Sequence, residues 1–271
     1  MLKILSSQIH HFIIDLFISF RYRGAMQTLF LKPNWPAPSY VKACTTLRTG
    51  GVSQPPFDQF NLAEHVGDNP EHVKANRELL KKNLNLPNEP VWINQTHSSI
   101  IVEALPKSAE TVADASFSSS KNQICVILTA DCLPILICHR SGSHVAAVHA
   151  GWRGLANGII ENTLDTLRLP NDELLVWLGP AISPANYEVG EEVRTQFVIH
   201  NPEATYAFLP SPNKRWLANL YALARIRLLK LGVTSIYGGD YCTYADPTRF
   251  YSYRRDGNKT GRMASLIWIG D

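Results

Sequence analysis

The stretch CVILTADCLPILICHRSGSHVAAVHAGWRG, residues 125–154, contains apolar runs that each end beside a soft metal ligand. Cys132 follows the first run, and His149 closes the run 144–149. Each ligand is followed closely by Pro or Gly. Short continuous apolar runs bounded by turn residues are typical of strands that are buried on both faces. The stretch therefore predicts buried strands whose ends carry metal-binding side chains.

Apolar spacing along the rest of the chain predicts a mixture of strands and helices. Strands are expected at 39–47, 91–94, 123–129, 144–149, 174–178, 235–237, 250–253 and 264–269. Helices are expected at 70–84, 155–167, 188–200 and 217–231. The two kinds of element alternate irregularly, and no linker or repeat interrupts the chain after Met26. This order predicts a single α/β or α+β domain with mixed sheets covered by helices.

The composition is that of an ordinary globular protein. Of 271 residues, 45% are apolar and 18% are charged, which argues against a disordered chain. The net charge of +3 comes without a basic cluster beyond Arg254-Arg255, so nucleic acid is not an expected partner. The five cysteines form no dense, spaced framework, which favours free thiols in a reducing compartment and hence the cytoplasm. The sequence leaves open whether the protein is a monomer or a small homo-oligomer.

The N-terminal segment differs from the rest of the chain. Its apolar run, 13–20, is interrupted by Asp15 and is shorter than the about 20 residues that a membrane-spanning helix needs. A single early lysine and a poor cleavage site also disfavour a signal peptide. We therefore expect no membrane association. We interpret residues 1–25 as an extension outside the fold and residues 26–271 as one domain.

Three soft ligands along the chain predict a metal centre. His97 closes the block Asn94-Gln95-Thr96-His97, and it joins Cys132 and His149 as a ligand placed where an apolar run meets a turn. One such residue alone is more often packed or hydrogen-bonded than metal-bound. Three such residues at strand ends favour a shared metal ion, because α/β proteins build their sites at strand ends. A metal with three protein ligands and one open position is usually catalytic, so these residues are the predicted ligands and catalytic centre.

The donor set favours zinc, with copper as the alternative. Blue copper needs a weak axial methionine, and the methionines at 1, 26 and 263 are remote in sequence. A multicopper oxidase would need several His-x-His pairs, and the chain has none. Two other interpretations stay open. One is a metal-free hydrolase with Cys132 as nucleophile and His97 or His149 as base. The other is a non-enzymatic zinc protein with Asp131 as a fourth ligand.

Basic side chains near the ligands predict an anion site. The turn 151–154 precedes an expected helix, and a Gly-rich turn at a helix N-terminus presents free N–H groups to an anion. An arginine side chain adds two parallel N–H donors that bind phosphate or carboxylate. The predicted substrate- and phosphate-binding residues are Arg48, Arg153, Arg254, Arg255 and Arg262, the last three framing an expected hairpin at 257–261. Asp131 is predicted to accept a proton or to hydrogen-bond to a metal ligand, and it could equally stabilise a turn.

At these blocks the sequence closely resembles the YfiH-like family, also called the multicopper polyphenol oxidase or laccase-domain family and, more recently, purine nucleoside phosphorylases. The resemblance runs from about Met26 to Asp271. Its carriers are RTGGVS (48–53), NL (61–62), GD (67–68), QTH (95–97), ADCLP (130–134), HAGWRG (149–154), GPAI (179–182), YEVG (187–190), CT (242–243), FYSYRR (250–255) and TGR (260–262). The family's zinc ligands fall on His97, Cys132 and His149. Ser98 departs from the pattern, which usually has Gly there.

The resemblance implies a four-layer α/β/β/α sandwich with mixed sheets. It implies a zinc enzyme that catalyses phosphorolysis of adenosine, inosine, guanosine and 5′-methylthioadenosine, with deamination of adenosine at the same site. Water activated by zinc fits deamination at C6 most easily, whereas phosphorolysis needs arginines that hold phosphate near C1′. Two alternatives come with the family: hydrolytic editing of peptidoglycan precursors and copper-dependent polyphenol oxidation.

A chain that starts at Met26 tests the predicted domain boundary. Because every block of the resemblance follows Met26, the shortened protein should fold and turn over substrate like the full chain. The measurements are soluble yield, melting temperature and specific activity of both chains. A large loss of solubility or activity in the shortened chain would show that the first residues pack on the domain or direct it elsewhere.

Overall fold

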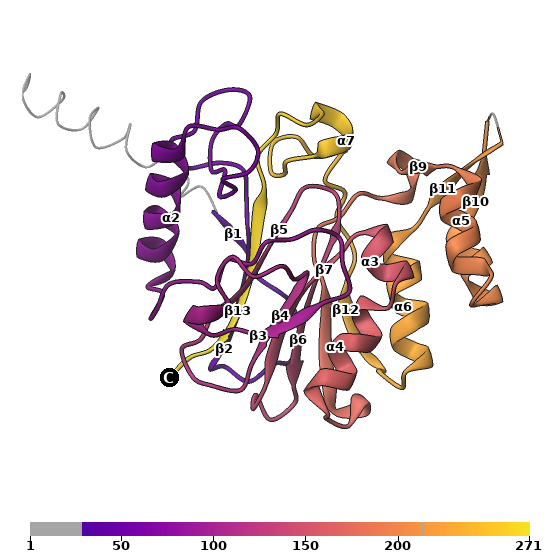
Figure 1. Cartoon of the computed structure of the whole chain (residues 1–271), viewed down its shortest axis with the longest axis horizontal. Helices are drawn as coiled ribbons and strands as arrows, with labels where there is room; N and C mark the ends of the chain where they lie inside the picture. The colour runs from indigo at the N-terminus through magenta and orange to yellow at the C-terminus, as the bar shows by residue number, and fades with distance from the viewer. Residues whose placement is uncertain (1–28, 213) are drawn as a thin grey trace, which may run out of the picture.

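The computed structural model describes residues 29–212 and 214–271 (Figure 1), so the extension predicted at 1–25 lies outside the described residues. The strands are β1 (Phe30–Leu31), β2 (Val41–Thr46), β3 (Ile101–Glu103), β4 (Ala115–Ser118), β5 (Cys125–Thr129), β6 (Leu133–His139), β7 (Val145–Ala150), β8 (Leu174–Leu178), β9 (Glu188–Val189), β10 (Phe208–Ser211), β11 (Arg215–Ala218), β12 (Ser235–Gly238) and β13 (Met263–Ile269). The α-helices are α2 (Pro70–Leu84), α3 (Trp152–Ala156), α4 (Ile159–Leu167), α5 (Glu191–Val198), α6 (Leu220–Lys230) and α7 (Tyr253–Asp256).

Two large sheets form the centre of the structure. One has the strand order β1-β2-β13-β5, and the other has the order β12-β8-β6-β7-β4-β3. The second sheet is mixed, because β12 runs parallel to β8 whereas β6 runs antiparallel to both β7 and β8. A small antiparallel sheet, β10-β11-β9, lies with α5 at one end of the molecule (Figure 1).

Side-chain alternation divides the core into three layers. In β6, Ile135 and Ile137 pack with helices, whereas Leu136 and Cys138 pack against the other sheet, as the period of two in a strand requires. Helix α2 covers the outer face of the first sheet through residues such as Leu80. Helices α3, α4 and α6 cover the outer face of the second sheet (Figure 1). The predicted four-layer α/β/β/α arrangement is thereby confirmed.

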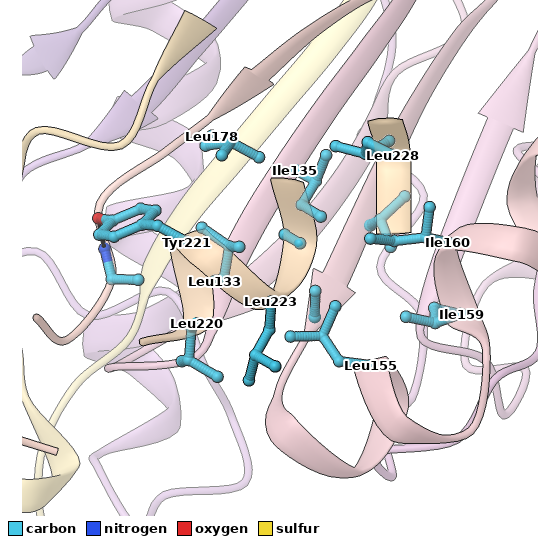
Figure 2. Close-up of a cluster of buried hydrophobic side chains, with 14 of the residues drawn as sticks. Leu133, Ile135, Leu155, Ile159, Ile160, Leu178, Leu220, Tyr221, Leu223 and Leu228 are labelled. Atoms are coloured by element: carbon cyan, nitrogen blue, oxygen red, sulfur yellow. Dashed lines mark hydrogen bonds between the residues drawn. The ribbon is translucent and has the colours of Figure 1, made fainter. Parts of the chain in front are cut away.

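The helix-covered face of the second sheet has the largest apolar cluster. Figure 2 shows Leu133, Ile135 and Leu178 of the sheet meeting Leu223 and Leu228 of α6. All five side chains are at most 2% exposed. Burial of this kind stabilises a fold by about 1.5–3 kcal/mol per side chain, so this layer is a main source of the domain's stability.

Some predicted helix starts are strands in the structure. The helices expected at 188–200 and 217–231 begin later, at Glu191 and Leu220. The residues before them form β9 and β11, which pair with each other. The helix expected at 155–167 is split by Gly158, whose φ of 85° lies in the left-handed region that glycine adopts readily.

Two predicted strands are absent from the described residues. The segment 91–94 makes only isolated bridges, through Val91 and Asn94. The prediction of a strand at 250–253 is wrong, because Tyr251 is buried in a loop and Tyr253 begins α7. The hairpin expected at 257–261 is therefore not formed. Within the part of the chain that the structure describes, no helix is both long and apolar enough to cross a membrane.

Two neighbouring leucines of α6 test the assignment of its buried face. Leu228 is fully buried, whereas Leu229 is 57% exposed. Leu228→Ala should lower the free energy of unfolding by about 2–5 kcal/mol, because it leaves a cavity between helix and sheet. Leu229→Ala, the matched control, should change it by less than about 0.5 kcal/mol. Urea unfolding measures both, and equal losses would contradict the assigned face.

Candidate metal centre

Three side chains from separate segments converge at one end of the two sheets. His97 lies in the loop before β3, Cys132 in the turn between β5 and β6, and His149 near the end of β7. Their potential ligand atoms all lie within 4.8 Å of one another. The structure therefore brings together the three residues that the sequence predicts as metal ligands.

The spacing of one pair of these atoms fits a shared zinc ion. Sγ of Cys132 lies 3.7 Å from Nε2 of His97. Zinc–sulfur and zinc–nitrogen bonds of about 2.3 and 2.0 Å that meet at the tetrahedral angle would separate the two atoms by about 3.5 Å. Gly151 makes this approach sterically feasible, since a Cβ there would lie 2.9 Å from Cδ2 of His97 and 3.0 Å from Sγ of Cys132.

A buried carboxylate, Asp114, holds both histidines. Its Oδ1 accepts a hydrogen bond from Nδ1 of His149 at 2.7 Å and from the backbone N–H of His97 at 3.0 Å. Its Oδ2 accepts from the backbone N–H and the hydroxyl of Ser98, at 2.6 and 2.7 Å. A carboxylate on Nδ1 of a histidine fixes the tautomer and leaves Nε2 free to bind a metal. Asp114 thus orients one ligand directly and the other through its backbone.

The charges at the centre favour a thiolate. Burial raises the pKa of Cys132, but the neighbouring His149 and His97 outweigh it, so the net shift is downward. For Asp114, burial again opposes ionisation, but hydrogen bonds from His149 and Ser98 lower its pKa to about 2. The thiolate is the form of cysteine that binds metals and attacks electrophiles. Ionised Cys132 and Asp114 therefore flank His149.

A cavity of about 420 Å³ opens over the centre, within the range of small-molecule pockets. Three of the predicted arginines line it, and each guanidinium lies over an aromatic ring that also lines it. The pairs are Arg153 over Trp152 at 4.4 Å, Arg254 over Tyr187 at 5.2 Å and Arg262 over Tyr253 at 5.9 Å from the ring centre. Stacking restricts the orientation of a guanidinium. Arg254 and Arg262 also donate through Nη1 to backbone carbonyls.

The five predicted arginines divide into two groups by their partners. Among the described residues, Arg153, Arg254 and Arg262 form no ion pair with a carboxylate. Arg48 instead pairs with Asp58 at 3.2 Å, and its other N–H groups bond backbone carbonyls.

Arg255 is engaged in the same way as Arg48. It pairs with Asp256 at 2.8 Å and donates to the carbonyls of Thr243, Tyr244 and Phe250. Neither Arg48 nor Arg255 lines the cavity. The structure thus does not place these two arginines where the sequence predicts phosphate contact, because protein groups already occupy their donors.

Asp131 has the geometry of a residue that holds loops together. Its carboxylate accepts hydrogen bonds from the hydroxyls of Thr243 and Ser252, at 2.6 and 3.0 Å, and from the backbone N–H of Arg254 at 2.6 Å. These contacts favour the loop-holding role among the three that the sequence allows. They also disfavour Asp131 as a fourth metal ligand, and within residues 29–212 and 214–271 no further His, Cys, Asp or Glu joins the group.

Sequence reasoning missed Asp114 and the aromatic lining. The sequence analysis assigns no role to Asp114, whereas in the structure Asp114 is fully buried and Ala115 begins β4. The signal that could have found it is chemical: a metal-ligating histidine needs a carboxylate or carbonyl on its other nitrogen. His65, which the sequence analysis does not single out, is exposed and also lines the cavity.

Gly151→Ala tests whether the three residues form one metal centre. The backbone of Gly151, with φ −68° and ψ 166°, is accessible to alanine, so the fold should persist. The added methyl group would press on His97 and Cys132, and overpacking of this kind costs about 1–3 kcal/mol, or about 5- to 150-fold in zinc affinity. Competition with a chelator measures the affinity, and Cys132→Ala shows the effect of losing a ligand outright. Wild-type zinc affinity in Gly151→Ala would contradict the assignment.

Comparison with known proteins identifies the family of this chain. Residues 42–270 match the family model described as multi-copper polyphenol oxidoreductase laccase. The chain is 55% identical over 243 residues to a purine nucleoside phosphorylase of Pseudomonas aeruginosa, with 89% of this chain and 99% of the relative covered. It is 48% identical over 238 residues to the purine nucleoside phosphorylase YfiH of Escherichia coli, with 88% and 97% covered.

Solved structures give the same result. A Neisseria meningitidis protein superposes with a TM-score of 0.87 at 47% identity, covering 90% of this chain and all of that one. YlmD from Geobacillus stearothermophilus superposes with a TM-score of 0.85 at 27% identity, covering 90% and 97%. The resemblance expected from the sequence blocks is confirmed: the chain belongs to the YfiH-type family, whose model is described as multi-copper polyphenol oxidoreductase laccase.

Proposed function

We propose that the protein is a zinc-dependent purine nucleoside phosphorylase. It would act on adenosine, inosine, guanosine and 5′-methylthioadenosine with inorganic phosphate, and it would deaminate adenosine at the same site. The observation that carries the proposal is the presence, in one cavity, of three potential metal ligands and three arginines that pair with no carboxylate of the described residues. The names of relatives at 55% and 48% identity support the reaction class.

His97, Cys132 and His149 would hold the zinc ion. When bound, zinc with three protein ligands supplies Lewis-acid activation of water or of a substrate oxygen. Asp114 keeps the proton of His149 on Nδ1, through the 2.7 Å hydrogen bond, so that Nε2 is the free donor. This hydrogen bond orients His149 for binding the ion.

Arg153, Arg254 and Arg262 would hold the anionic substrate. Phosphate carries up to two negative charges, and arginine forks bind it through paired N–H groups. In phosphorolysis an oxygen of the held phosphate attacks C1′ of the ribose, and the bond from C1′ to the purine nitrogen breaks. The rings of Trp152, Tyr187 and Tyr253 and the side chain of Ile182 would supply apolar surface for the purine.

A cysteine hydrolase is the second candidate, and one observation favours it. Cys132, His149 and Asp114 follow the order thiol, imidazole and carboxylate, with His149 bonded to Asp114 at 2.7 Å, and this order also serves nucleophilic catalysis. Zinc bound to Cys132 would leave no free thiolate. Copper oxidation has less support, because the described residues form a single three-member group of potential ligands.

The deciding experiment combines metal analysis with product analysis. Purified protein should contain about one zinc per chain and should convert inosine and phosphate into hypoxanthine and ribose 1-phosphate. Parallel reactions with a peptidoglycan precursor that carries a wrongly added amino acid, and with a phenol plus copper, test the alternatives. Metal-free protein that hydrolyses substrate and loses activity on thiol alkylation would favour the cysteine hydrolase and contradict the proposal.

Arg153→Ala tests the assignment of the phosphate site. A charged hydrogen bond contributes about 1.5–3 kcal/mol, or about 10- to 150-fold. The substitution should raise the KM for phosphate or lower the rate of phosphorolysis by that order, with adenosine deamination less affected. Steady-state kinetics of both reactions measure the difference.

A matched control is Arg194→Ala. Arg194 also stacks on a tryptophan, at 4.3 Å from the ring of Trp216, but it does not line the cavity. This variant should leave both reactions unchanged. If Arg153→Ala lowers phosphorolysis and deamination in parallel, Arg153 contacts the nucleoside or supports the cavity, and the phosphate role passes to Arg254 and Arg262.

A further inference from the structure

Thr129 is a residue of the cavity wall that has a buried hydroxyl. It is the last residue of β5 and is 1% exposed, and it is among the residues that line the cavity. Its Oγ1 has no hydrogen-bond partner among the described residues. A buried hydroxyl without a partner is unfavourable, and most such groups in folded proteins are satisfied. The orphaned hydroxyl therefore points to a partner that the described protein does not itself supply.

The strand pattern directs Thr129 toward the metal centre. Cys125 and Ile127 of β5 face the layer between the two sheets, and alternation places Thr129 in the same row. In the opposite sheet, the row that contains Ala147 ends at His149. Thr129 and His149 thus enter the same layer from opposite sheets, and both line the cavity.

The residues beside Thr129 in the sequence, and the nearby Gln95, are uncharged. Its neighbours Leu128 and Ala130 are apolar, and Gln95 is already engaged with the backbone of Leu128 through two hydrogen bonds, at 2.7 and 2.9 Å. A neutral hydroxyl can both donate and accept. It therefore suits a sugar hydroxyl, ring nitrogen or carbonyl better than a phosphate dianion, for which the cavity has arginines.

We infer that the hydroxyl of Thr129 hydrogen-bonds to the nucleoside and contributes to its selection. The inference rests on the proposed function and adds a substrate contact to it. A substrate group that hydrogen-bonds to Oγ1 offsets the energetic cost of the unpartnered hydroxyl in the free protein. Thr129 thus belongs to the residues that a folded protein keeps for binding at the expense of stability.

Thr129→Val separates the two effects because it keeps the side-chain shape and removes only the hydroxyl. The melting temperature should stay the same or rise, since an unpartnered polar atom has been removed. The KM and the dissociation constant for inosine should rise by about 3- to 10-fold, the range for one neutral hydrogen bond. The KM for phosphate and the zinc content should not change. Thr129→Ser, which keeps the hydroxyl, should bind inosine like the wild type.

Ser116→Ala is the matched control. The hydroxyl of Ser116 in β4 is also buried without a hydrogen-bond partner among the described residues, but Ser116 does not line the cavity. This substitution should likewise preserve the melting temperature, and it should leave inosine binding and turnover unchanged. Comparing Thr129→Val with Ser116→Ala separates the loss of a contact in the cavity from the general effect of removing a buried hydroxyl.

The experiment measures inosine binding without phosphate, turnover of inosine with phosphate, melting temperature and zinc content for the wild type and the three variants. Wild-type inosine binding and KM in Thr129→Val would overturn the inference and leave the phosphorylase proposal intact. A loss of binding accompanied by a lower melting temperature or lost zinc would also overturn it, as a structural effect. A wild type that binds inosine without converting it would contradict only the proposed reaction. A wild type that does neither would refute both.

Discussion

The carboxylate of Asp114 makes the hydrogen bonds on which the site depends. It is fully buried, and it ties the loop at 96–98 to His149 at the end of β7. His97 has a φ of 62°, a left-handed conformation that is uncommon for a residue other than glycine. The hydrogen bonds to Asp114 hold the backbone there. Without this carboxylate, the two histidines would have no common support.

The four-layer architecture explains why the cavity lies where it does. Two sheets packed face to face leave an apolar layer between them, and polar chemistry is accommodated where that layer reaches solvent. His149 comes from the second sheet, Thr129 comes from the first, and Cys132 lies in the turn that connects the two. Asp131 bonds Ser252 and the backbone of Arg254, so the turn that carries Cys132 also positions the segment that carries an arginine of the cavity.

The sequence was sufficient where local chemistry is distinctive and insufficient where the partner of a residue decides its role. The grouping of His97, Cys132 and His149 could be predicted because three soft ligands each stand where an apolar run meets a turn. Asp114 was missed because an aspartate between two alanines also resembles a turn. Arg48 was assigned to phosphate although it pairs with Asp58, because a sequence does not show which carboxylate an arginine meets. The predicted helices include β9 and the end of β11, because both strands are short and adjoin helices with similar apolar spacing.

X-ray absorption at the zinc edge of the purified protein tests the central claim most directly. The account predicts one zinc per chain with one sulfur at about 2.3 Å, two imidazole nitrogens at about 2.0–2.1 Å and one further light donor that is not a protein side chain. Loss of the sulfur signal in Cys132→Ser would assign it to this residue. A first coordination sphere with two or more sulfurs, or a purified active protein without zinc, would contradict the account.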